Sequence, residues 1–426
     1  MNRDTAKSPI ASERVSAYCA RGDDRGPRIL LVGGEDHDLR IAFLLALRAE
    51  GYCVSAAGTG DAAPFAQAGL TYHSFHFDRS ANPLADWLSL GALTRIFGQV
   101  RPDIVQSFDT KPNILVPLAA GRVGGFPVVR TINGMGWLYS SKAPLALALR
   151  PAYCALNRLA ARWTSASVFQ NREDMSYFER NGMVGDGVSR LIPGSGVDIA
   201  AFRPVPSAGD SPAELREQLG LGTSPVVVTV TRVTREKGIP TLLQAAALVH
   251  AARPDVRFLL VGPREGTGRF AVSQAEIDAH APYVVATGKR SDVPALLRLA
   301  DVFAFPTEFR EGVPRVLLEA AVAGLPIIAT RMPGCTDVVE HGHTGILVTP
   351  GSPQELAQAI LQALADPAAG RIMAERAAEL VRREFSLELT VDRYRKLYAE
   401  LLTSASAIPS RPIQRPALSR ADDAIP

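Results

Sequence analysis

The sequence predicts an α/β protein made of two doubly wound halves. Short apolar segments alternate with helical patterns along the chain, which is typical of parallel sheets covered by helices. A segment rich in Pro, Gly, Ser and Asp, from Pro193 to Pro212, interrupts this alternation. The chain has 426 residues, of which 47% are hydrophobic and 21% charged, so we expect two domains with sizeable cores and exclude global disorder.

The first half opens with the strand Arg28–Val32, the pair Gly33-Gly34 and a helical pattern over Leu39–Gly51. Strand, glycine turn and helix in this order begin a doubly wound sheet. The glycine pair lets the backbone approach a ligand closely, although a plain tight turn explains it equally well. Further strands are expected at Tyr52–Ala57, Leu70–Phe77, Asp103–Phe108, Pro127–Ile132 and Ser167–Gln170.

The second half repeats the alternation. Its strands are expected at Val226–Val230, Arg257–Val261, Tyr283–Thr287, Asp301–Phe305, Ile327–Thr330 and Ile346–Val348, and its helices at Pro240–Ala252, Val293–Leu299, Val316–Ala323, Pro353–Ala365 and Ala374–Glu384. An amphipathic pattern over Leu387–Leu402 predicts a final helix. The predicted divisions are a disordered leader at 1–26, an N-terminal domain at 27–195, a linker at 196–222, a C-terminal domain at 223–385, a helix at 386–402 that packs back toward the N-terminal domain, and a disordered tail at 403–426.

Charge, cysteines and hydropathy limit the class of protein. The net charge of +3 is too small to indicate nucleic-acid binding by itself. Cys19, Cys53, Cys154 and Cys335 form no C-x-x-C pair, which is typical of a reduced, cytosolic protein. The polar segment Met1–Gly26 lacks the apolar core of a signal peptide, and no apolar run is long enough to cross a membrane. We therefore expect a cytoplasmic protein.

Two glutamates stand at the turn between a strand and a helix in the second half. Glu311 follows the strand Asp301–Phe305 in a loop, and Glu319 lies inside the helix Val316–Ala323. Ligands of open α/β sheets gather at the carboxyl ends of the strands, and the next helix N-terminus attracts anions. Carboxylates accept hydrogen bonds from paired hydroxyls, so the two glutamates suit a sugar nucleotide. The plain alternative is a solvated loop glutamate and a glutamate on a helix surface.

A second polar turn, T-R-V-T-R-E-K-G-I-P, follows the first strand of this half. It places Arg232 and Lys237 near the start of a helix. An arginine fork and a lysine point charge aimed at one place suit a diphosphate leaving group. Solvated surface charges are the alternative. Arg235 lies in the same loop, and we assign it no role.

These motifs resemble the donor site of the retaining family 4 glycosyltransferases of the GT-B fold. The resemblance rests on the Glu311 to Glu319 spacing followed by G-L-P-I-I-A-T and P-G-C-T-D-V-V, and it extends over Arg28–Leu402. It implies two Rossmann-like domains facing a central cleft, with a nucleotide sugar held by the C-terminal domain. It also implies that no metal or other cofactor is needed, and no D-x-D motif is placed to bind a metal.

The resemblance also assigns donor-site roles. Glu311 would hold the hydroxyls of the donor sugar near the anomeric carbon, Glu319 the ribose hydroxyls, and the two basic residues the departing diphosphate. The segment T-G-K-R-S-D-V, Thr287 to Val293, is similar to the nucleobase pocket. The expected catalytic residues are Glu311, Arg232 and Lys237, and the expected donor-binding residues are Gly34, Arg232, Lys237, Gly288, Arg290, Val293, Gly312, Val313, Pro314 and Glu319.

In the first half, four motifs resemble the subgroup that extends polyprenyl-diphosphate-linked sugars in O-antigen, capsule or glycan assembly. They are D-T-K-P-N (Asp109–Asn113), T-I-N-G-M-G-W (Thr131–Trp137), V-F-Q-N (Val168–Asn171) and I-P-G-S-G-V-D (Ile192–Asp198). We expect the donor to be a UDP-sugar. The expected acceptor-binding residues are Lys111, Asn113, Asn133, Gly134 and Trp137.

The sequence departs from the family in its histidines. Many relatives have histidines at the end of the strand before K-P-N, where this chain has Gln106, Ser107 and Phe108, and some have one where Asn133 stands. No catalytic histidine can therefore be assigned there. His37 could replace it, but we interpret His37 as an ordinary surface histidine.

The segment between Asp109 and Glu173 contains no acidic residue. Its basic residues are Lys111, Arg122, Arg130, Lys142, Arg150, Arg158, Arg162 and Arg172, and it also carries Trp137, Leu138, Tyr139 and the apolar run Pro144–Leu149. Basic charge beside interfacial aromatics suits an anionic membrane and a lipid diphosphate. We therefore predict peripheral contact with the inner face of the cytoplasmic membrane. The alternative is a solvated basic face, and no motif supports nucleic acid as a partner.

Two other functions remain open on the same fold. One is a catalytically silent subunit that binds a nucleotide sugar or supports a partner transferase, which the missing histidines favour. The other is a sugar-nucleotide 2-epimerase, which would need further acid and base groups around the sugar; the two spaced glutamates and the K-G turn argue against it.

Overall fold

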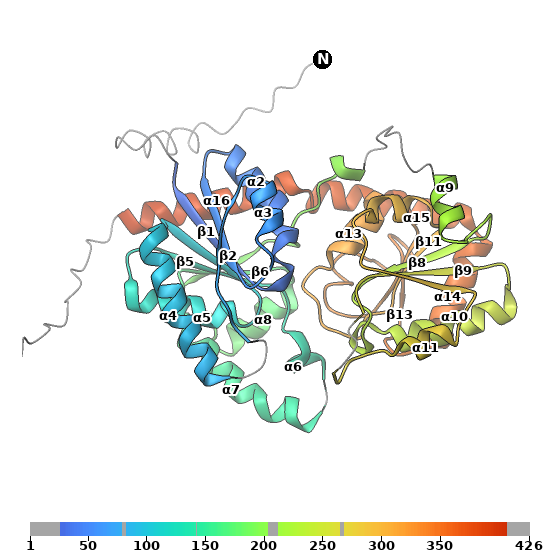
Figure 1. Ribbon diagram of the computed structural model, residues 1–426, viewed down its shortest axis with the longest axis horizontal. Coiled ribbons are helices and arrows are strands. Elements are labelled where there is room, and N and C mark those ends of the chain that lie inside the picture. The colour runs from blue at the N-terminus through green and yellow to red at the C-terminus, as the bar shows by residue number, and fades with distance from the viewer. Residues whose placement is uncertain (1–25, 79–81, 142, 203–211, 265–267, 407–426) are drawn as a thin grey trace, which may run out of the picture.

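The computed structural model describes residues 26–78, 82–141, 143–202, 212–264 and 268–406. Two parallel sheets lie in separate domains (Figure 1). The N-terminal sheet has the strand order β3-β2-β1-β4-β5-β6-β7 and the C-terminal sheet the order β10-β9-β8-β11-β12-β13. The neighbouring strands within each sheet pair in parallel. The predicted class, two Rossmann-like doubly wound domains, is confirmed.

The N-terminal domain buries both faces of its sheet. Its strands are β1 (Arg28–Gly33), β2 (Cys53–Gly58), β3 (Thr71–Ser74), β4 (Ile104–Phe108), β5 (Val128–Ile132), β6 (Ala166–Phe169) and β7 (Val188–Leu191). Its helices are η1 (Glu35–Arg40), α2 (Ile41–Ala49), α3 (Ala63–Gln67), α4 (Pro83–Val100), α5 (Pro112–Val123), α6 (Gly136–Ser140), α7 (Pro144–Ala161) and α8 (Arg172–Arg180). Side chains alternate along β1, so that Ile29 and Leu31 pack toward α2 whereas Leu30 and Val32 pack toward α4 and α5.

The C-terminal domain repeats this arrangement. Its strands are β8 (Val226–Val230), β9 (Arg257–Val261), β10 (Val284–Gly288), β11 (Val302–Phe305), β12 (Ile327–Thr330) and β13 (Ile346–Val348). Its helices are α9 (Pro212–Gln218), η3 (Arg235–Lys237), α10 (Ile239–Ala252), α11 (Gln274–Asp278), α12 (Val293–Arg298), α13 (Arg315–Val322), α14 (Pro353–Ala365) and α15 (Pro367–Glu384). Val226 and Val228 pack toward α12, α13 and α15, and Val227 toward α10 and α14.

The chain crosses from one domain to the other twice, and the two crossing segments lie side by side. The segment after β7 runs beside the end of α15, where the Val197 amide donates to Phe385 O and the Leu387 amide to Val197 O, both at 3.0 Å. A short helix, η2 (Ala200–Phe202), follows the first passage. The last helix, α16 (Leu387–Ser406), then crosses back onto the N-terminal domain (Figure 1). Its Tyr394 and Tyr398 are buried in the core beside α2.

Several boundaries differ from the predictions. A 3-10 turn precedes α2, β3 is shorter than the predicted strand, and α15 begins at Pro367 because Asp366 caps it. The predicted linker contains α9, and α16 continues to Ser406 rather than Leu402. Apart from Gly26, the predicted leader lies outside the described residues, as does the predicted tail from residue 407 onward.

Candidate active site

Glu311 and Lys237, each predicted to be catalytic, form a pair in the structure. Lys237 ends η3 after β8, and Glu311 lies in the loop between β11 and α13, so the adjacency of β8 and β11 brings them together. The Lys237 ammonium forms an ion pair with the Glu311 carboxylate and lies 5.0 Å above the Phe309 ring. Thr307 Oγ1 is 3.5 Å from the same carboxylate. Both charged side chains are largely buried, so this pair forms a well-defined polar centre at the carboxyl ends of two strands.

Gly238 makes this centre possible. It adopts a left-handed conformation (φ +70°), and a Cβ there would lie 1.9 Å from the Pro306 carbonyl oxygen. Only glycine fits such a close approach of two backbones. The turn after β8 therefore packs directly on the loop that carries Glu311. Arg232, in the same turn, is partly buried.

Glu319 lies one turn into α13 and pairs with Arg315 at 2.8 Å. Burial raises the pKa of Glu319, and the Arg315 guanidinium opposes that shift. Arg315 also donates to Leu39 O in the other domain at 2.7 Å. One arginine thus joins the predicted ribose-binding carboxylate to the N-terminal domain.

The backbone amides at the start of α13 are engaged across the domain junction. The Gly312 amide donates to Asn133 O at 2.9 Å, and the Val313 amide donates to Gln170 Oε1 at 3.0 Å. Gly134 packs against the same loop, where a Cβ would lie 2.8 Å from the Gly312 nitrogen. The amides predicted to face the donor are therefore bonded to the N-terminal domain in this structure. Pro314 is the N-cap of α13.

Three further predicted donor residues, Gly288, Arg290 and Val293, lie at or just after the end of β10, on the same carboxyl edge of the C-terminal sheet. Gly288 adopts a left-handed conformation and its carbonyl accepts from the Gly262 amide at 2.9 Å. Arg290 pairs with Asp292 at 2.6 Å, and Val293 begins α12. Two strands separate β10 from β11, so this group flanks the Glu311 centre.

Asp109 is a site residue that the sequence analysis quoted only as part of a motif. It follows β4 in a left-handed conformation (φ +71°), and its carboxylate accepts from the Gly34 amide at 2.9 Å and from Arg40 Nη2 at 3.3 Å. Asn133 Nδ2 lies 3.4 Å away. Burial by itself would raise the pKa of Asp109, but Arg40 and the Gly34 amide outweigh it and hold the pKa below its ordinary value. The sequence feature that could have indicated Asp109 as a site residue is its position directly after a buried strand.

The predicted acceptor residues lie in different surroundings. Asn133 and Gly134 reach the domain junction, whereas Asn113 is buried and bonded to Ser107 Oγ and Thr131 O, both at 2.7 Å. Lys111 turns to the Asp86 carboxylate at 2.5 Å. The Trp137 side chain and Lys142 lie outside the described part of the structure.

His37 is not a surface residue, and that interpretation was wrong. Its ring is fully buried against Gly33 and packs on Phe65 with ring centroids 5.5 Å apart, while Nε2 lies 3.3 Å from Leu31 O. Burial, helped by the nearby Arg40, lowers the pKa of His37 to about 3. The ring is neutral and belongs to the core.

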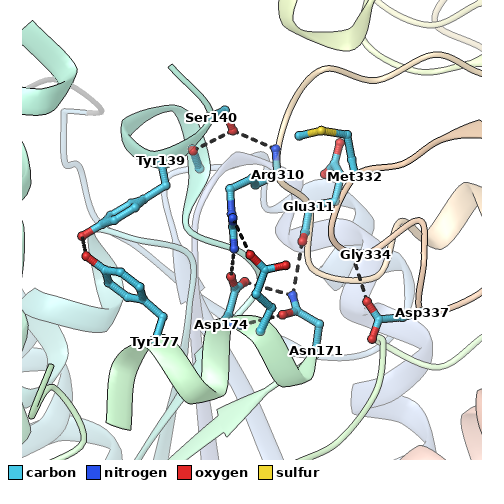
Figure 2. A network of polar contacts seen from close by, with 12 residues as sticks. Tyr139, Ser140, Asn171, Asp174, Tyr177, Arg310, Glu311, Met332, Gly334 and Asp337 are labelled. Atoms are coloured by element: carbon cyan, nitrogen blue, oxygen red, sulfur yellow. Dashed lines mark hydrogen bonds and ion pairs between the residues drawn. The ribbon is translucent and has the colours of Figure 1, made fainter. Parts of the chain in front are cut away.

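A network that sequence reasoning missed surrounds Arg310, directly before Glu311 (Figure 2). Its guanidinium pairs with Glu173 at 2.8 Å and with the buried Asp174 at 3.0 Å, both on α8 of the N-terminal domain. The only available signal was an arginine next to the predicted catalytic glutamate. In the described ranges no cluster of three or more His, Cys, Asp or Glu residues could hold a metal ion.

Two family models and a solved structure match this chain. Residues 36–194 match the family described as "Glycosyl transferase 4-like domain", and residues 224–366 match "Glycosyl transferases group 1". The Anabaena protein HepE, solved in complex with UDP and glucose, superposes with a TM-score of 0.70 at 20% identity and covers 88% of this chain and 100% of its own.

Three named glycosyltransferases are similar to this chain in sequence. An N,N'-diacetylbacillosaminyl-diphospho-undecaprenol alpha-1,3-N-acetylgalactosaminyltransferase of Campylobacter jejuni is 23% identical over 78% of this chain and 87% of its own. A UDP-Gal:alpha-D-GlcNAc-diphosphoundecaprenol alpha-1,3-galactosyltransferase of Escherichia coli is 27% identical over 76% and 82%. A GDP-mannose-dependent alpha-(1-6)-phosphatidylinositol monomannoside mannosyltransferase of Mycolicibacterium smegmatis is 30% identical over 65% and 70%.

The fold and the family matches thus define a two-domain glycosyltransferase. The chain belongs to the group 1 glycosyl transferases of family 4, which have the GT-B fold. Its activity is the transfer of a sugar from a nucleotide sugar.

Proposed function

We propose that this enzyme transfers a sugar from a UDP-sugar to a polyprenyl-diphosphate-linked saccharide, with retention of the anomeric configuration. The observation that carries the proposal is the buried pair of Lys237 and Glu311, with Glu319 on the following helix. The Campylobacter and Escherichia relatives support it, because the names of both contain a diphosphate-linked undecaprenol.

The donor would bind at the C-terminal domain. Lys237 and Arg232 stabilise the diphosphate as negative charge develops on it during cleavage of the glycosidic bond. Glu311 accepts hydrogen bonds from the hydroxyls of the transferred sugar, and Glu319 from the ribose. For this to happen Lys237 must exchange part of its contact with Glu311 for the phosphate, and Arg315 must release Glu319. The domains must also separate for the donor to enter the site.

The acceptor would bind at the N-terminal domain. Asp109 stays ionised because its pKa is lowered, so it can accept a hydrogen bond from an acceptor hydroxyl. Asn133 lies beside it and has a buried Oδ1 without a partner in the described structure. These two residues occupy the region where many family members have histidines. Closure of the domains would then exclude water from the reacting sugar.

The membrane contact needs a different basis from the predicted basic stretch. Arg130 of that stretch is fully buried, and Arg150 bonds Leu138 O at 3.0 Å, so neither is a free surface charge. Large apolar side chains are exposed instead near the starts of α4 and α7: Leu84, Trp87, Leu88, Leu145, Leu147 and Leu149. These helices lie on the same side of the domain, on either side of α5 (Figure 1). Together with the exposed Arg122 and Arg162 of the same domain, these apolar side chains suit an anionic membrane surface.

No helix of the described chain is both long and apolar enough to cross a membrane. From the exposed apolar and basic side chains of the N-terminal domain, we propose peripheral contact at the inner face of the cytoplasmic membrane, where a lipid-linked acceptor would be within reach of that domain.

Turnover with a panel of donors tests the proposal. The full chain is incubated with UDP-, GDP- and dTDP-sugars and an undecaprenyl-diphosphate-linked monosaccharide, with a lipid-free saccharide and water as controls. We expect release of UDP from one UDP-sugar, dependent on the lipid-linked acceptor, and an α-linked product by NMR. Release that does not depend on the lipid would refute the proposed acceptor, and release of GDP would refute the proposed donor.

Two outcomes would favour other functions. Nucleotide binding without any turnover would identify a silent binding subunit. Interconversion of the sugar nucleotide itself, without an acceptor, would identify an epimerase.

A further inference from the structure

The loop that carries Glu311 is held from two sides. Its catalytic side chain is held by Lys237 in its own domain, whereas its main chain is bonded to the other domain. The Arg310 amide donates to Ser140 Oγ at 2.7 Å, and the Glu311 carbonyl accepts from Asn171 Nδ2 at 3.4 Å. The next two amides are engaged across the same junction. The conformation of four consecutive residues therefore depends on contact between the domains.

Arg310 is the charged anchor of this contact. Its guanidinium lies between Glu173 and Asp174 at the start of α8, with 17% of its side chain exposed, and the Asp174 side chain is fully buried (Figure 2). Asn171 caps α8 and donates to the other oxygen of Asp174 at 2.9 Å, so the carboxylate has a fixed orientation. A buried, hydrogen-bonded charge pair resists separation because each partner alone is left unpaired.

We propose that Arg310 is a positioning residue: its ion pairs with Asp174 and Glu173 set the loop so that Glu311 reaches its reacting geometry only when the domains are closed. This inference rests on the proposed role of Glu311 at the donor sugar. It assigns no chemistry to Arg310, which acts through the main chain of its neighbour. The catalytic centre is therefore completed at the same time as the domains close.

The test compares Arg310→Met, Asp174→Asn and the double variant with the wild-type full chain. Arg190→Met is the matched control, because Arg190 forms a distant ion pair with Glu400, 2.9 Å long and exposed, that joins β7 to α16. We expect kcat to fall about 10- to 100-fold in both single variants, since a small misplacement of a catalytic group has effects of that size. The affinity for UDP, measured by calorimetry, should stay within about threefold, because the proposed diphosphate and ribose contacts are intact in the open form.

Three further readouts separate positioning from stability. The losses in the double variant should be far from additive, because both changes break one contact. Arg310→Lys should recover part of kcat, since lysine can still reach one carboxylate. Exchange of the Gly312 and Val313 amide hydrogens should quicken about tenfold or more in Arg310→Met but not in Arg190→Met.

The proposal is wrong if kcat of Arg310→Met stays near the wild-type value, or if kcat and UDP affinity fall together. Unchanged amide exchange would refute it as well. That last measurement needs no activity, so it decides the role of Arg310 even if the wild type transfers no sugar, in which case the proposed function would be the one that fails.

Discussion

Two carboxylates at the domain junction have opposite electrostatic surroundings. Asp109 keeps a pKa below its ordinary value, because Arg40 and the Gly34 amide outweigh the effect of burial. Glu319 has a raised pKa, because the effect of burial outweighs that of the Arg315 guanidinium. An ionised Asp109 can accept a hydrogen bond from a hydroxyl group. Hydrogen bonds from bound ribose hydroxyls would, in contrast, stabilise the ionised form of Glu319 and lower its pKa again.

Glu311→Ala should abolish transfer without abolishing nucleotide binding. We expect kcat to fall by about 100-fold or more, while the Kd for UDP stays within about threefold because Lys237 is released toward the diphosphate. Glu308→Ala is the control, since this exposed carboxylate of the same loop bonds only Thr241 Oγ1, at 2.9 Å, among the described contacts. Transfer by Glu311→Ala at the rate of the control would rule out the proposed role.

His37 should make the fold sensitive to mild acid. Its pKa is about 3 in the folded chain and near 6.5 in the unfolded chain, so only the unfolded chain takes up this proton between those values. The stability that a neutral His37 maintains is complete above pH 6.5 and is lost as the pH falls, by about 2 kcal/mol at pH 5. His37→Gln should flatten that part of the profile of unfolding free energy against pH, measured in urea. Parallel profiles for both proteins would contradict the assignment.

At the scale of elements, the site depends on the contact between two turns. The β8–η3 turn supplies Lys237, the β11–α13 loop supplies Glu311, and Gly238 lets the two backbones touch at Pro306. The parallel order of β8 and β11 places both turns at one edge. The ion pair between Lys237 and Glu311 therefore needs both turns in contact.

Gly238→Ala tests this contact. Gly220→Ala is a matched control, because Gly220 has a similar left-handed φ of +64° but nothing within 4 Å of a new Cβ. The control should lose about 1 kcal/mol of unfolding free energy from backbone strain alone. Gly238→Ala should lose clearly more than the control and also lower kcat, because the Pro306 loop must move. Equal losses in both variants would show that the contact is unimportant.

At the scale of the whole molecule, the two domains are joined by α16 and by the polar junction around Arg310. Tyr398 of α16 is buried in the N-terminal core and bonds Gln106, one of the residues that stand where relatives have histidines. Helix α16 therefore completes the core of the first domain. Exposed apolar side chains remain on α4 and α7, on the outside of that domain.

Membrane binding should depend on these exposed side chains. Leu145 and Leu147 are 58% and 47% exposed, so Leu145→Glu/Leu147→Glu should leave the fold unchanged and reduce binding to phosphatidylglycerol vesicles about tenfold or more in co-sedimentation. Leu248→Glu/Ile372→Glu is the control, with comparable exposure on the other domain. Equal binding by both variants, or wild-type binding that ignores lipid charge, would refute the proposed surface.

The sequence by itself determined the class of fold, the two-domain organisation and the placing of Glu311 and Lys237 in turns that follow strands of the second half. These follow from strand and helix periodicity, and from the rule that the carboxyl ends of parallel strands share an edge. Burial of an individual polar residue could not be predicted, because it depends on packing between segments far apart in sequence. His37, Asn113 and Arg130 were assigned to the surface or the acceptor for that reason. Arg310 and Asp174 lie 136 residues apart, and only the closed arrangement of the two domains makes them partners.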